Sequence, residues 1–321
     1  QNISSGGLAS ATAISSGGVQ YISSGGSEIA AMISSGGSQY VLSTGFASGA
    51  TLIGGSQTIS SGGTANATII SNGGNQIVNG GANIASASLL SGGTQTLLSG
   101  ASVTSTTVNS GAVQSVGSTA SATFTNLSGG TQTISGGSVL STTIFTGGIA
   151  SILAGGFASA NTINSGGFGN VASGGTASLT TINSGGIGNV SSGGTASLTT
   201  INSGGIENVS SGGIALNATI LSSGVQNIYR SGVASGGFIS IGGIQNVSSG
   251  GSAIYAQISS GGIENISVGG SAISATVSSG GSQVVYNLGI ASGATLSGGY
   301  QNISSGGSAA VSYTHLRAHE T

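Results

Sequence analysis

Residues 161–213 read NTINSGGFGNVASGGTASLTTINSGGIGNVSSGGTASLTTINSGGIENVSSGG and contain almost three copies of one unit. The spacing between successive glycine pairs alternates between 8 and 11, so the unit is about 19 residues long. A period of roughly 20 residues, in units too short to enclose a core alone, is typical of a solenoid whose neighbouring coils cover one another. One aliphatic position recurs in steps of 18 or 19 and has 17 copies: Ile3, Ile22, Val41, Ile59, Val78, Leu97, Val116, Ile134, Ile152, Val171, Val190, Val209, Ile228, Val247, Ile266, Val285 and Ile303.

The composition is unusual but periodic. The 321 residues include 65 glycines and no proline, cysteine or tryptophan, and only 2% are charged. Without a period such a chain would be expected to be disordered, but here 37% of residues are hydrophobic and recur in phase, so there is a core to bury. The net charge of -2 gives no basic groove for nucleic acid. No apolar run approaches the roughly 18 residues of a membrane span.

Each unit carries three aliphatic columns. Glycine pairs mark corners because glycine reaches positive φ without a Cβ penalty, and the β-branched residues between them favour strands over helix. In the unit at 174–192 the columns contain Ala177, Ile182 and Val190. Ala177 and Ile182 are five residues apart, which would put them on opposite faces of one straight strand, so we expect a bend between them. The predicted fold is all-β, a single elongated parallel solenoid of about 17 coils with three short strands per coil.

Two regions differ in their sequence. Residues 1–311 are the repeat region, predicted to be a fragment of a longer protein because the chain starts inside a repeat without Met. The register loosens between Thr94 and Leu127, where single glycines replace the pairs, and we expect a kink or a looser coil there. Residues 312–321 break the repeat and contain both histidines, and we predict an artefactual or disordered tail.

Side chains with acid–base or metal-binding chemistry are nearly absent from the repeat region. It has no His, Asp, Lys or Cys, and its charges are Arg230, Glu28, Glu207 and Glu264. Acid–base, metal and covalent mechanisms need residue types from the missing set. Glu207 and Glu264 occupy one repeat position three coils apart, too far for a glycosidase pair, and are predicted to be solvated. We therefore predict no enzyme activity, no cofactor, and no catalytic, cofactor-binding or metal-binding residue.

A glutamine column lies two residues before the Val190-type position. It is either a recognition stripe for a ligand or a structural ladder of amides bonded between successive coils, as in cross-β stacks, and we favour the ladder. Strict alternation puts these side chains on the Val190 face, whereas glutamate at two of the positions indicates a wet site, because an unpaired buried carboxylate is costly. The sequence leaves the direction open. The column contains Gln1, Gln20, Gln39, Gln57, Gln76, Gln95, Gln114, Gln132, Gln226, Gln245, Gln283 and Gln301.

Three other patterns carry less weight. A partial threonine column, including Thr181 and Thr200, could form a hydroxyl face like that of ice-binding solenoids, but threonine is also a good strand residue. Sequons such as the one at Asn189 follow from the repeat. The glycine pairs lack the GK[ST] of a phosphate loop, and the repeat region lacks the Asp of calcium-binding nonapeptides, so neither ligand is expected.

The segments ISSGG, QN[IV]SSGG and GGxAxxTxI, repeated in phase from Gln1 to about Val311, resemble the 19-residue repeats of bacterial autotransporter adhesins of the AIDA type (adhesin involved in diffuse adherence). The resemblance implies a right-handed parallel β-helix that is secreted as a passenger and anchored at the outer membrane of a Gram-negative cell by a C-terminal translocator outside this chain. It implies adhesion to host-cell or bacterial surface components, self-association, autoaggregation and biofilm formation, and in some members heptose on Ser and Thr.

The leading functional hypothesis is an adhesive surface rod whose weak polar contacts on one lateral face add up by multivalency. A second is a non-adhesive stalk that displays another domain. A third is a fragment of a β-helical polysaccharide-processing enzyme, which would need a site elsewhere in a longer protein. No nucleic-acid partner and no membrane insertion of this segment are expected.

Overall fold

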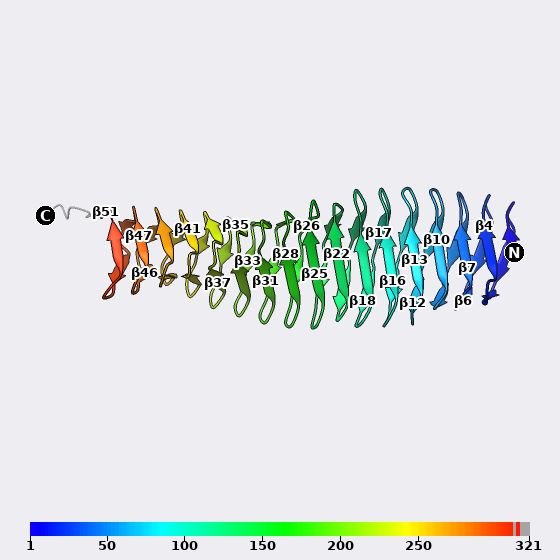
Figure 1. The fold of residues 1–321 in the computed structure, drawn as a ribbon, viewed down its shortest axis with the longest axis horizontal. Coiled ribbons are helices and arrows are strands. Elements are labelled where there is room, and N and C mark those ends of the chain that lie inside the picture. Colours follow the sequence, from blue (N-terminus) through cyan, green and yellow to red (C-terminus); the bar gives the residue numbers. More distant parts are fainter. Residues whose placement is uncertain (311–312, 315–321) are drawn as a thin grey trace. The chain divides into compact units, whose positions relative to one another are not determined.

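The computed structural model describes residues 1–310 and 313–314. It contains 51 strands and, among those residues, no helix (Figure 1). The chain divides into two units, residues 1–161 and 162–321, built on the same plan. Within the predicted tail 312–321, Tyr313–Thr314 form β51, which pairs with β48 (Thr295–Ser297). The rest of that prediction lies outside the described residues.

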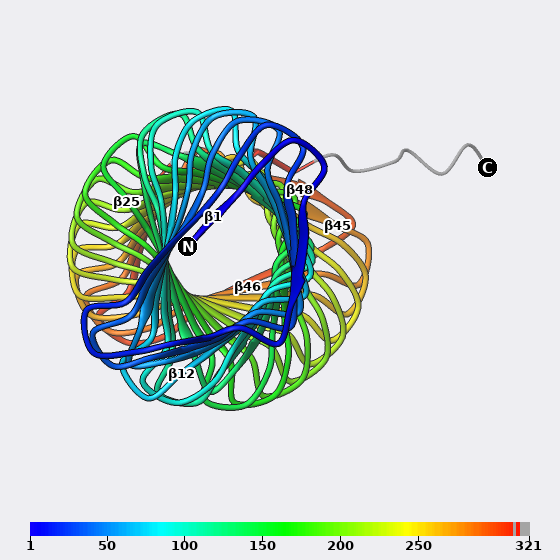
Figure 2. The same cartoon turned by 90° about the vertical axis from the view of Figure 1, so that its right-hand side faces the viewer.

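Each coil contains three short strands. In one coil these are β31 (Ile187–Val190), β32 (Thr195–Ser197) and β33 (Thr200–Ile201), which belong to sheets A, B and C respectively. The first coil, which faces the viewer in Figure 2, has a three-sided outline. Within each unit every strand pairs in parallel with the equivalent strand one coil later, as in Val190 opposite Val209. The predicted all-β parallel solenoid with three strands per coil is confirmed.

Sheet A holds the longest strands, most of them four residues. In the first unit they are β1 (Asn2–Ile3), β4 (Val19–Ile22), β7 (Ser38–Val41), β10 (Ser56–Ile59), β13 (Asn75–Val78), β16 (Thr94–Leu97), β19 (Val113–Val116), β22 (Thr131–Ser135) and β25 (Ile149–Leu153). In the second unit they are β28 (Phe168–Val171), β31, β34 (Ile206–Val209), β37 (Val225–Ile228), β40 (Ile244–Val247), β43 (Ile263–Ile266), β46 (Ser282–Val285) and β49 (Tyr300–Ile303).

Sheets B and C have strands of two or three residues. Sheet B contains β2 (Leu8–Ser10), β5 (Ser27–Ile29), β8 (Phe46–Ser48), β11 (Thr64–Asn66), β14 (Asn83–Ala85), β17 (Ser102–Thr104), β20 (Ser121–Thr123), β23 (Ser138–Leu140) and β26 (Phe157–Ser159), then β29 (Thr176–Ser178), β32, β35 (Ile214–Leu216), β38 (Val233–Ser235), β41 (Ser252–Ile254), β44 (Ser271–Ile273), β47 (Ile290–Ser292) and β50 (Ser308–Ala310). Sheet C contains β3 (Ala13–Ile14), β6 (Met32–Ser34), β9 (Thr51–Ile53), β12 (Ile69–Ser71), β15 (Ser88–Leu89), β18 (Thr107–Asn109), β21 (Asn126–Ser128) and β24 (Thr143–Ile144), then β27 (Thr162–Ile163), β30 (Thr181–Ile182), β33, β36 (Thr219–Ile220), β39 (Phe238–Ile239), β42 (Gln257–Ile258), β45 (Thr276–Ser278), β48 and β51.

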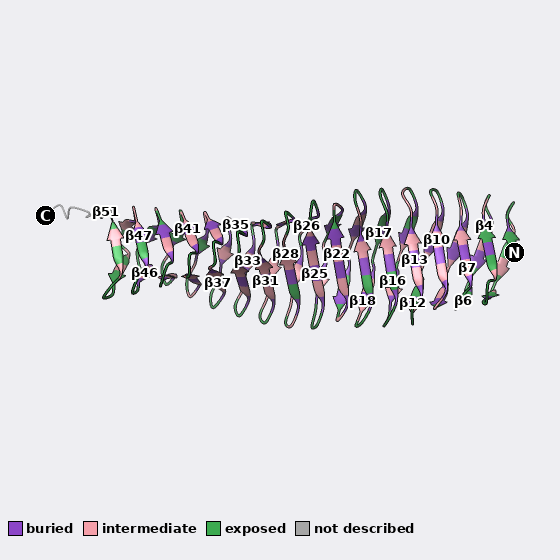
Figure 3. Ribbon diagram, viewed as in Figure 1, coloured by how far each residue is buried: buried purple, intermediate pink, exposed green. Residues whose placement is uncertain are grey.

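The three predicted columns form the core. Val171, Val190 and Val209 are aligned on adjacent strands and are 6%, 2% and 0% exposed. Ala177 and Ile182 represent the other two columns and are equally enclosed. Buried residues alternate with half-buried or exposed residues along the strands, and most corner residues are exposed, as Figure 3 shows. Burial of each Ile or Val contributes about 1.5–3 kcal/mol to the free energy of folding. Because each side chain packs against the coils next to it, contacts between neighbouring coils supply most of the stability.

The predicted bend between the Ala and Ile columns is made by single left-handed residues. Leu179 and Leu198 have φ of 54° and 55°, and both side chains are exposed. This residue turns the chain from one side of the coil to the next. Ala177 and Ile182 therefore both face inward despite their odd spacing. In these two coils no glycine marks the corner, although Gly49, Gly236 and Gly293 occupy it in three other coils. The sequence therefore predicted the bend without identifying the residue that makes it.

The looser coil predicted between Thr94 and Leu127 is wrong. Strands β16 and β19 pair in regular register, with Thr94 opposite Val113. Alanine takes the place of the second glycine at this corner, and the Ala101 amide donates to the Leu98 carbonyl just as the Gly213 amide donates to Ser210. The coil of irregular length comes slightly later in the chain, between β20 and β23, where Ser121 pairs with Ser138.

Candidate functional site

The glutamine column lies inside the core of the first unit. From Gln20 to Gln132 each side chain is at most 1% exposed, because alternation places it on the same face as the Val column two residues later. From Gln39 to Gln132 each Nε2 donates to the Oε1 of the preceding glutamine at 2.6–2.7 Å, and Gln20 donates to Gln1 at 2.9 Å, which forms an unbroken amide ladder. The predicted structural ladder is confirmed. The recognition-stripe alternative is wrong for these residues because no ligand can reach them.

The prediction that Glu207 and Glu264 are solvated, at a wet position, is also wrong. They are 1% and 0% exposed and continue the column in the second unit. Gln226 donates to Glu207 Oε2 and Gln283 donates to Glu264 Oε2, both at 2.7 Å. An unpaired buried carboxylate is costly, but neighbouring amides and a shift of its protonation reduce that cost here.

Burial changes the ionisation of both carboxyls. It raises the pKa of Glu207, a shift opposed by hydrogen bonds from Gln226 and Thr199. It raises the pKa of Glu264 from 4.5 to about 7, opposed by the amide of Gln283. Raised carboxyl pKa values accompany many catalytic sites. Here the groups lie in the closed core, so they are not placed to act on a substrate.

Glu28 is a third buried carboxyl, in the Ala column between Ala9 and Ala47. It accepts hydrogen bonds from Gln20 Nε2 at 2.8 Å and from the Thr12 hydroxyl at 2.9 Å. Its charge is evident in the sequence, but its burial is not. The only signal was its position in a column that is otherwise mostly alanine.

With these carboxyls inside, the outer surface is almost uncharged. Among residues 1–310, Arg230 is the one charged side chain that is exposed. Its guanidinium carbon lies 5.9 Å from the centre of the Tyr229 ring. Neutral polar side chains, glycine and single apolar side chains make up the remainder. The chemistry available to a partner over this part of the chain is therefore hydroxyl, amide and aliphatic contact.

An asparagine ladder runs along the outer face of sheet A in the second unit. Six asparagines occupy the position between the buried column residue and the buried Val or Ile, and each Nδ2 donates to the preceding Oδ1 at 2.9–3.0 Å. Several of these asparagines were predicted only as sequons, although their recurrence at every nineteenth residue is present in the sequence. The ladder contains Asn170, Asn189, Asn208, Asn227, Asn246 and Asn265.

Two other outer-face features are less regular. The rings of Tyr21 and Tyr40 stack with centroids 5.1 Å apart in the same outward column of the first unit. The threonine column lies on the outer face of sheet C, where Thr181 and Thr200 are half-buried and paired in register. It is interrupted by residues such as Met32, so it does not form a continuous hydroxyl face.

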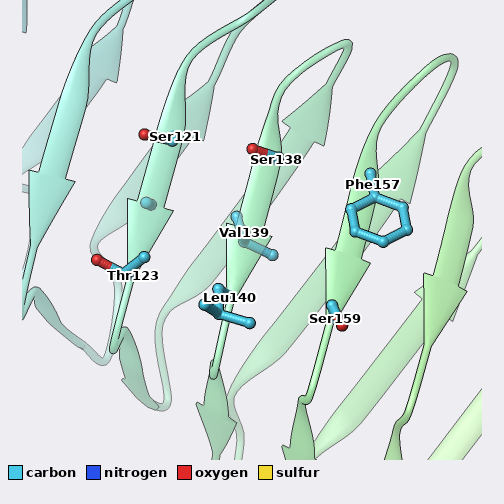
Figure 4. Close-up of a pocket in the computed structure, with 8 residues that line it drawn as sticks. Ser121, Thr123, Ser138, Val139, Leu140, Phe157 and Ser159 are labelled. Carbon is cyan, nitrogen blue, oxygen red and sulfur yellow. The ribbon is translucent and has the colours of Figure 1, made fainter.

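A shallow hollow of about 340 Å³ lies on the outer face of sheet B, over β20, β23 and β26 (Figure 4). It arises where Ser121 pairs with Ser138, because this coil is shorter than its neighbours. Its sides are formed by hydroxyls together with Leu140 and Phe157, which are 44% and 43% exposed. No charged or buried polar group points into it, so it has none of the features of a catalytic site.

Two kinds of site are absent from the described part of the chain. No group of three or more His, Cys, Asp or Glu residues that could hold a metal ion occurs within residues 1–310 and 313–314. Over the same residues there is no helix long and apolar enough to cross a bilayer.

A solved structure of a TibA fragment hyper-glycosylated by TibC is similar to this chain over nearly its whole length. The two are 34% identical, with a TM-score of 0.68, and the similarity covers 94% of this chain and 99% of the other. The chain belongs to the AIDA-type autotransporter adhesin passengers. Its role as a passenger segment agrees with the solenoid, and this relative is an adhesin passenger rather than an enzyme.

The other comparisons add little about this passenger. The Dettilon tailspike protein is 12% identical with a TM-score of 0.30, over 92% of this chain and 61% of the other. An endo-xylogalacturonan hydrolase from Aspergillus tubingensis is 13% identical with a TM-score of 0.17, over 91% and 88%. Scores this low carry no functional argument. No protein-family model and no curated protein matches the chain.

Proposed function

We propose that this passenger segment acts outside a bacterial cell, at its surface, where it attaches the cell to host-cell or bacterial surface components and to copies of itself, leading to autoaggregation and biofilm formation. The observation that carries the proposal is the nearly uncharged outer surface, on which Arg230 is the exposed charged side chain of residues 1–310. Identical copies with little net charge approach without long-range repulsion. Short-range polar and aliphatic contacts can then form between them.

The outer face of sheet A in the second unit is the proposed contact face. The asparagine ladder runs along it beside a half-buried aliphatic column that includes Ile187, Ile206 and Val225. Both columns repeat once per coil, so a partner with a matching repeat meets the same contact many times. Individually weak contacts then give strong overall attachment through effective concentration.

Adding charge to the proposed contact face tests this proposal. Displaying the chain on a non-aggregating bacterium is expected to make the cells settle, and Asn189→Lys, Asn227→Lys and Asn265→Lys together are expected to keep them dispersed at low salt. Adding salt should restore part of the settling, because screening weakens repulsion between exposed charges. The measurement is the turbidity of standing cultures, with surface display checked by antibody.

A matched control carries three lysines on another face. Thr181→Lys, Thr200→Lys and Thr219→Lys put the same charge on the outer face of sheet C, where all three threonines are half-buried. This variant should settle nearly as the parent does. Equal settling of the ladder variant and the parent would remove sheet A as the contact face. Dispersed parent cells would remove the adhesive function of this segment and leave the stalk hypothesis, on which a displayed domain adheres and deleting coils leaves its adhesion intact.

We also propose that exposed corner hydroxyls of this passenger accept glycans. The similar TibA fragment is hyper-glycosylated by TibC, and the SSGG corners here present exposed serines such as Ser192 and Ser211. Co-production with TibC is expected to add sugar masses seen by intact-protein mass spectrometry. Peptide mapping should find them on exposed serines and not on buried hydroxyls such as Thr199. An unmodified chain, or modification only outside the corners, would contradict this.

A further inference from the structure

In the buried column of the second unit, one contact between neighbouring side chains has no hydrogen to form a hydrogen bond. Glu207, Gln226, Gln245 and Glu264 lie on the adjacent strands β34, β37, β40 and β43 and meet in three contacts along the column. An amide stacked in such a column offers an N–H to one neighbour and a carbonyl oxygen to the other. Two amides therefore supply two hydrogens for three contacts, and this count holds whichever way the amides point.

The deficit lies between Gln245 and Glu264. Gln226 Nε2 donates to Glu207 Oε2 at 2.7 Å, and Gln245 Nε2 donates to Gln226 Oε1 at 2.6 Å. The next two oxygens, Gln245 Oε1 and Glu264 Oε1, are both buried and have no hydrogen-bond partner. Two buried acceptors on neighbouring strands repel each other, and each also carries the desolvation cost of an unsatisfied group.

We propose that Glu264 is a neutral carboxylic acid in the folded protein and donates a hydrogen bond from Oε1 to Gln245 Oε1. A protonated carboxyl has one O–H donor and retains acceptor capacity, so it can occupy a ladder position as glutamine does. Its other oxygen already accepts from Gln283 Nε2 at 2.7 Å. One proton on Glu264 therefore connects the ladder from Glu207 to Gln301, where Gln301 donates to Gln283 at 2.7 Å.

Local sequence explains why the proton belongs to Glu264 and not to Glu207. Thr199, eight residues before Glu207, donates to that carboxyl in addition to Gln226, and both donors favour the ionised form. The residue eight before Glu264 is Ala256, which is buried and has no hydroxyl. Glu264 therefore has one donor where Glu207 has two.

The surroundings of Glu264 contain no compensating charge. Burial raises its pKa to about 7, and the one opposing cause is the Gln283 amide. On the strands beside it the column neighbours are the neutral Gln245 and Gln283. The other ionisable side chains of residues 162–310 are Glu207, Tyr229, Arg230, Tyr255, Tyr286 and Tyr300, all of which except Glu207 are exposed or half-buried.

The proposal implies that the stability of the coil containing Glu264 depends on pH. Because the pKa is higher in the folded chain than its ordinary value of 4.5, the folded chain binds more protons than the unfolded chain between pH 4.5 and about 7. The stabilising contribution of Glu264 is full below pH 4.5 and is lost as the pH rises through about 7. Glu207 shifts in the same direction. Strand β43 and its neighbours should therefore loosen at alkaline pH.

Infrared spectroscopy tests where the proton is. The chain has only four acidic side chains, so the carbonyl band of a protonated carboxyl is observable against little background. At pH 6 the full chain is expected to show this band, which Glu264→Gln removes and Glu207→Gln retains. The band should disappear with a midpoint near 7, well above the ordinary glutamate value. Absence of the band at pH 6, or its loss in Glu207→Gln alone, would overturn the assignment.

Hydrogen exchange supplies a second measurement that does not depend on the band. Between pH 5 and pH 8 the opening equilibrium of β43 in the parent is expected to rise by roughly two orders of magnitude relative to Glu264→Gln at the same pH. The side-chain amide that this substitution introduces supplies the missing donor at every pH. Ala256→Thr, which provides the hydroxyl that Glu207 has, should move the infrared midpoint downward. An unchanged parent-to-variant ratio across this pH range would contradict the proposal.

Discussion

Replacing Gln95 by alanine is expected to lower the local unfolding free energy of the coils around β16 by about 3–5 kcal/mol. Gln95 donates to Gln76 Oε1 at 2.6 Å and accepts from Gln114 Nε2 at 2.7 Å. Both neighbours are fully buried, so water cannot replace the lost partner. The variant therefore leaves one orphaned acceptor, one orphaned donor and a cavity in the core.

The matched control lies one residue away. Thr96 is half-buried on the outer face of the same strand, and Thr96→Ala is expected to change the same free energy by no more than about 0.5 kcal/mol. Native-state hydrogen exchange of the full chain is the right measurement, because long repeat arrays need not unfold in two states. Similar effects of the two substitutions would mean that the ladder contributes little to the core.

Ile182→Ala is expected to cost about 4 kcal/mol because two glycines interrupt the column beside it. The column position in this coil is Gly188, and a Cβ there would lie 2.7 Å from Ile182 Cδ1. The isoleucine therefore fills the volume that glutamine fills in other coils. Gly169 stands in the same relation to Ile163 in the preceding coil. Little side-chain volume remains nearby to fill the cavity left by the truncated isoleucine.

A double-mutant cycle tests whether Ile182 fills the space beside Gly188 or only contributes to the core as any buried isoleucine does. In the parent, Gly188→Val should destabilise by about 1–3 kcal/mol through overpacking against Ile182. In the Ile182→Ala background the same change should stabilise by about 2 kcal/mol, because the valine refills the space. Opposite signs measure the coupling of the two positions. Simple additivity of the two substitutions would contradict the proposed filling.

Much of the architecture could be predicted from the sequence because the repeat carries its own register. An aliphatic residue every 18 or 19 positions fixes which residues stack, and the alternation of a strand fixes which neighbours share their face. The columns through Val190, Ala177 and Ile182 were predicted as core and are buried. The need for a corner between Ala177 and Ile182 followed from their odd spacing alone.

Expectations from glycine content and from charge were less reliable. Single glycines between Thr94 and Leu127 indicated a looser coil, yet Ala101 forms the same turn hydrogen bond as a glycine. Glutamate at positions 207 and 264 indicated a wet column, although alternation predicted a buried one. In each case a local residue preference was weighed against a pattern of the whole repeat, and the pattern was correct.

By itself, the sequence determined the period, the all-β solenoid, the aliphatic columns and the alignment of the glutamines in one column, because these depend only on spacing along the chain. Only the tertiary structure decided that the ladder lies inside, that Leu198 makes the corner, and that Glu207 meets Thr199 while Glu264 faces an orphaned oxygen of Gln245. The reason is geometric. Burial and protonation depend on atoms brought together from neighbouring coils, and spacing within one coil does not specify where those atoms point.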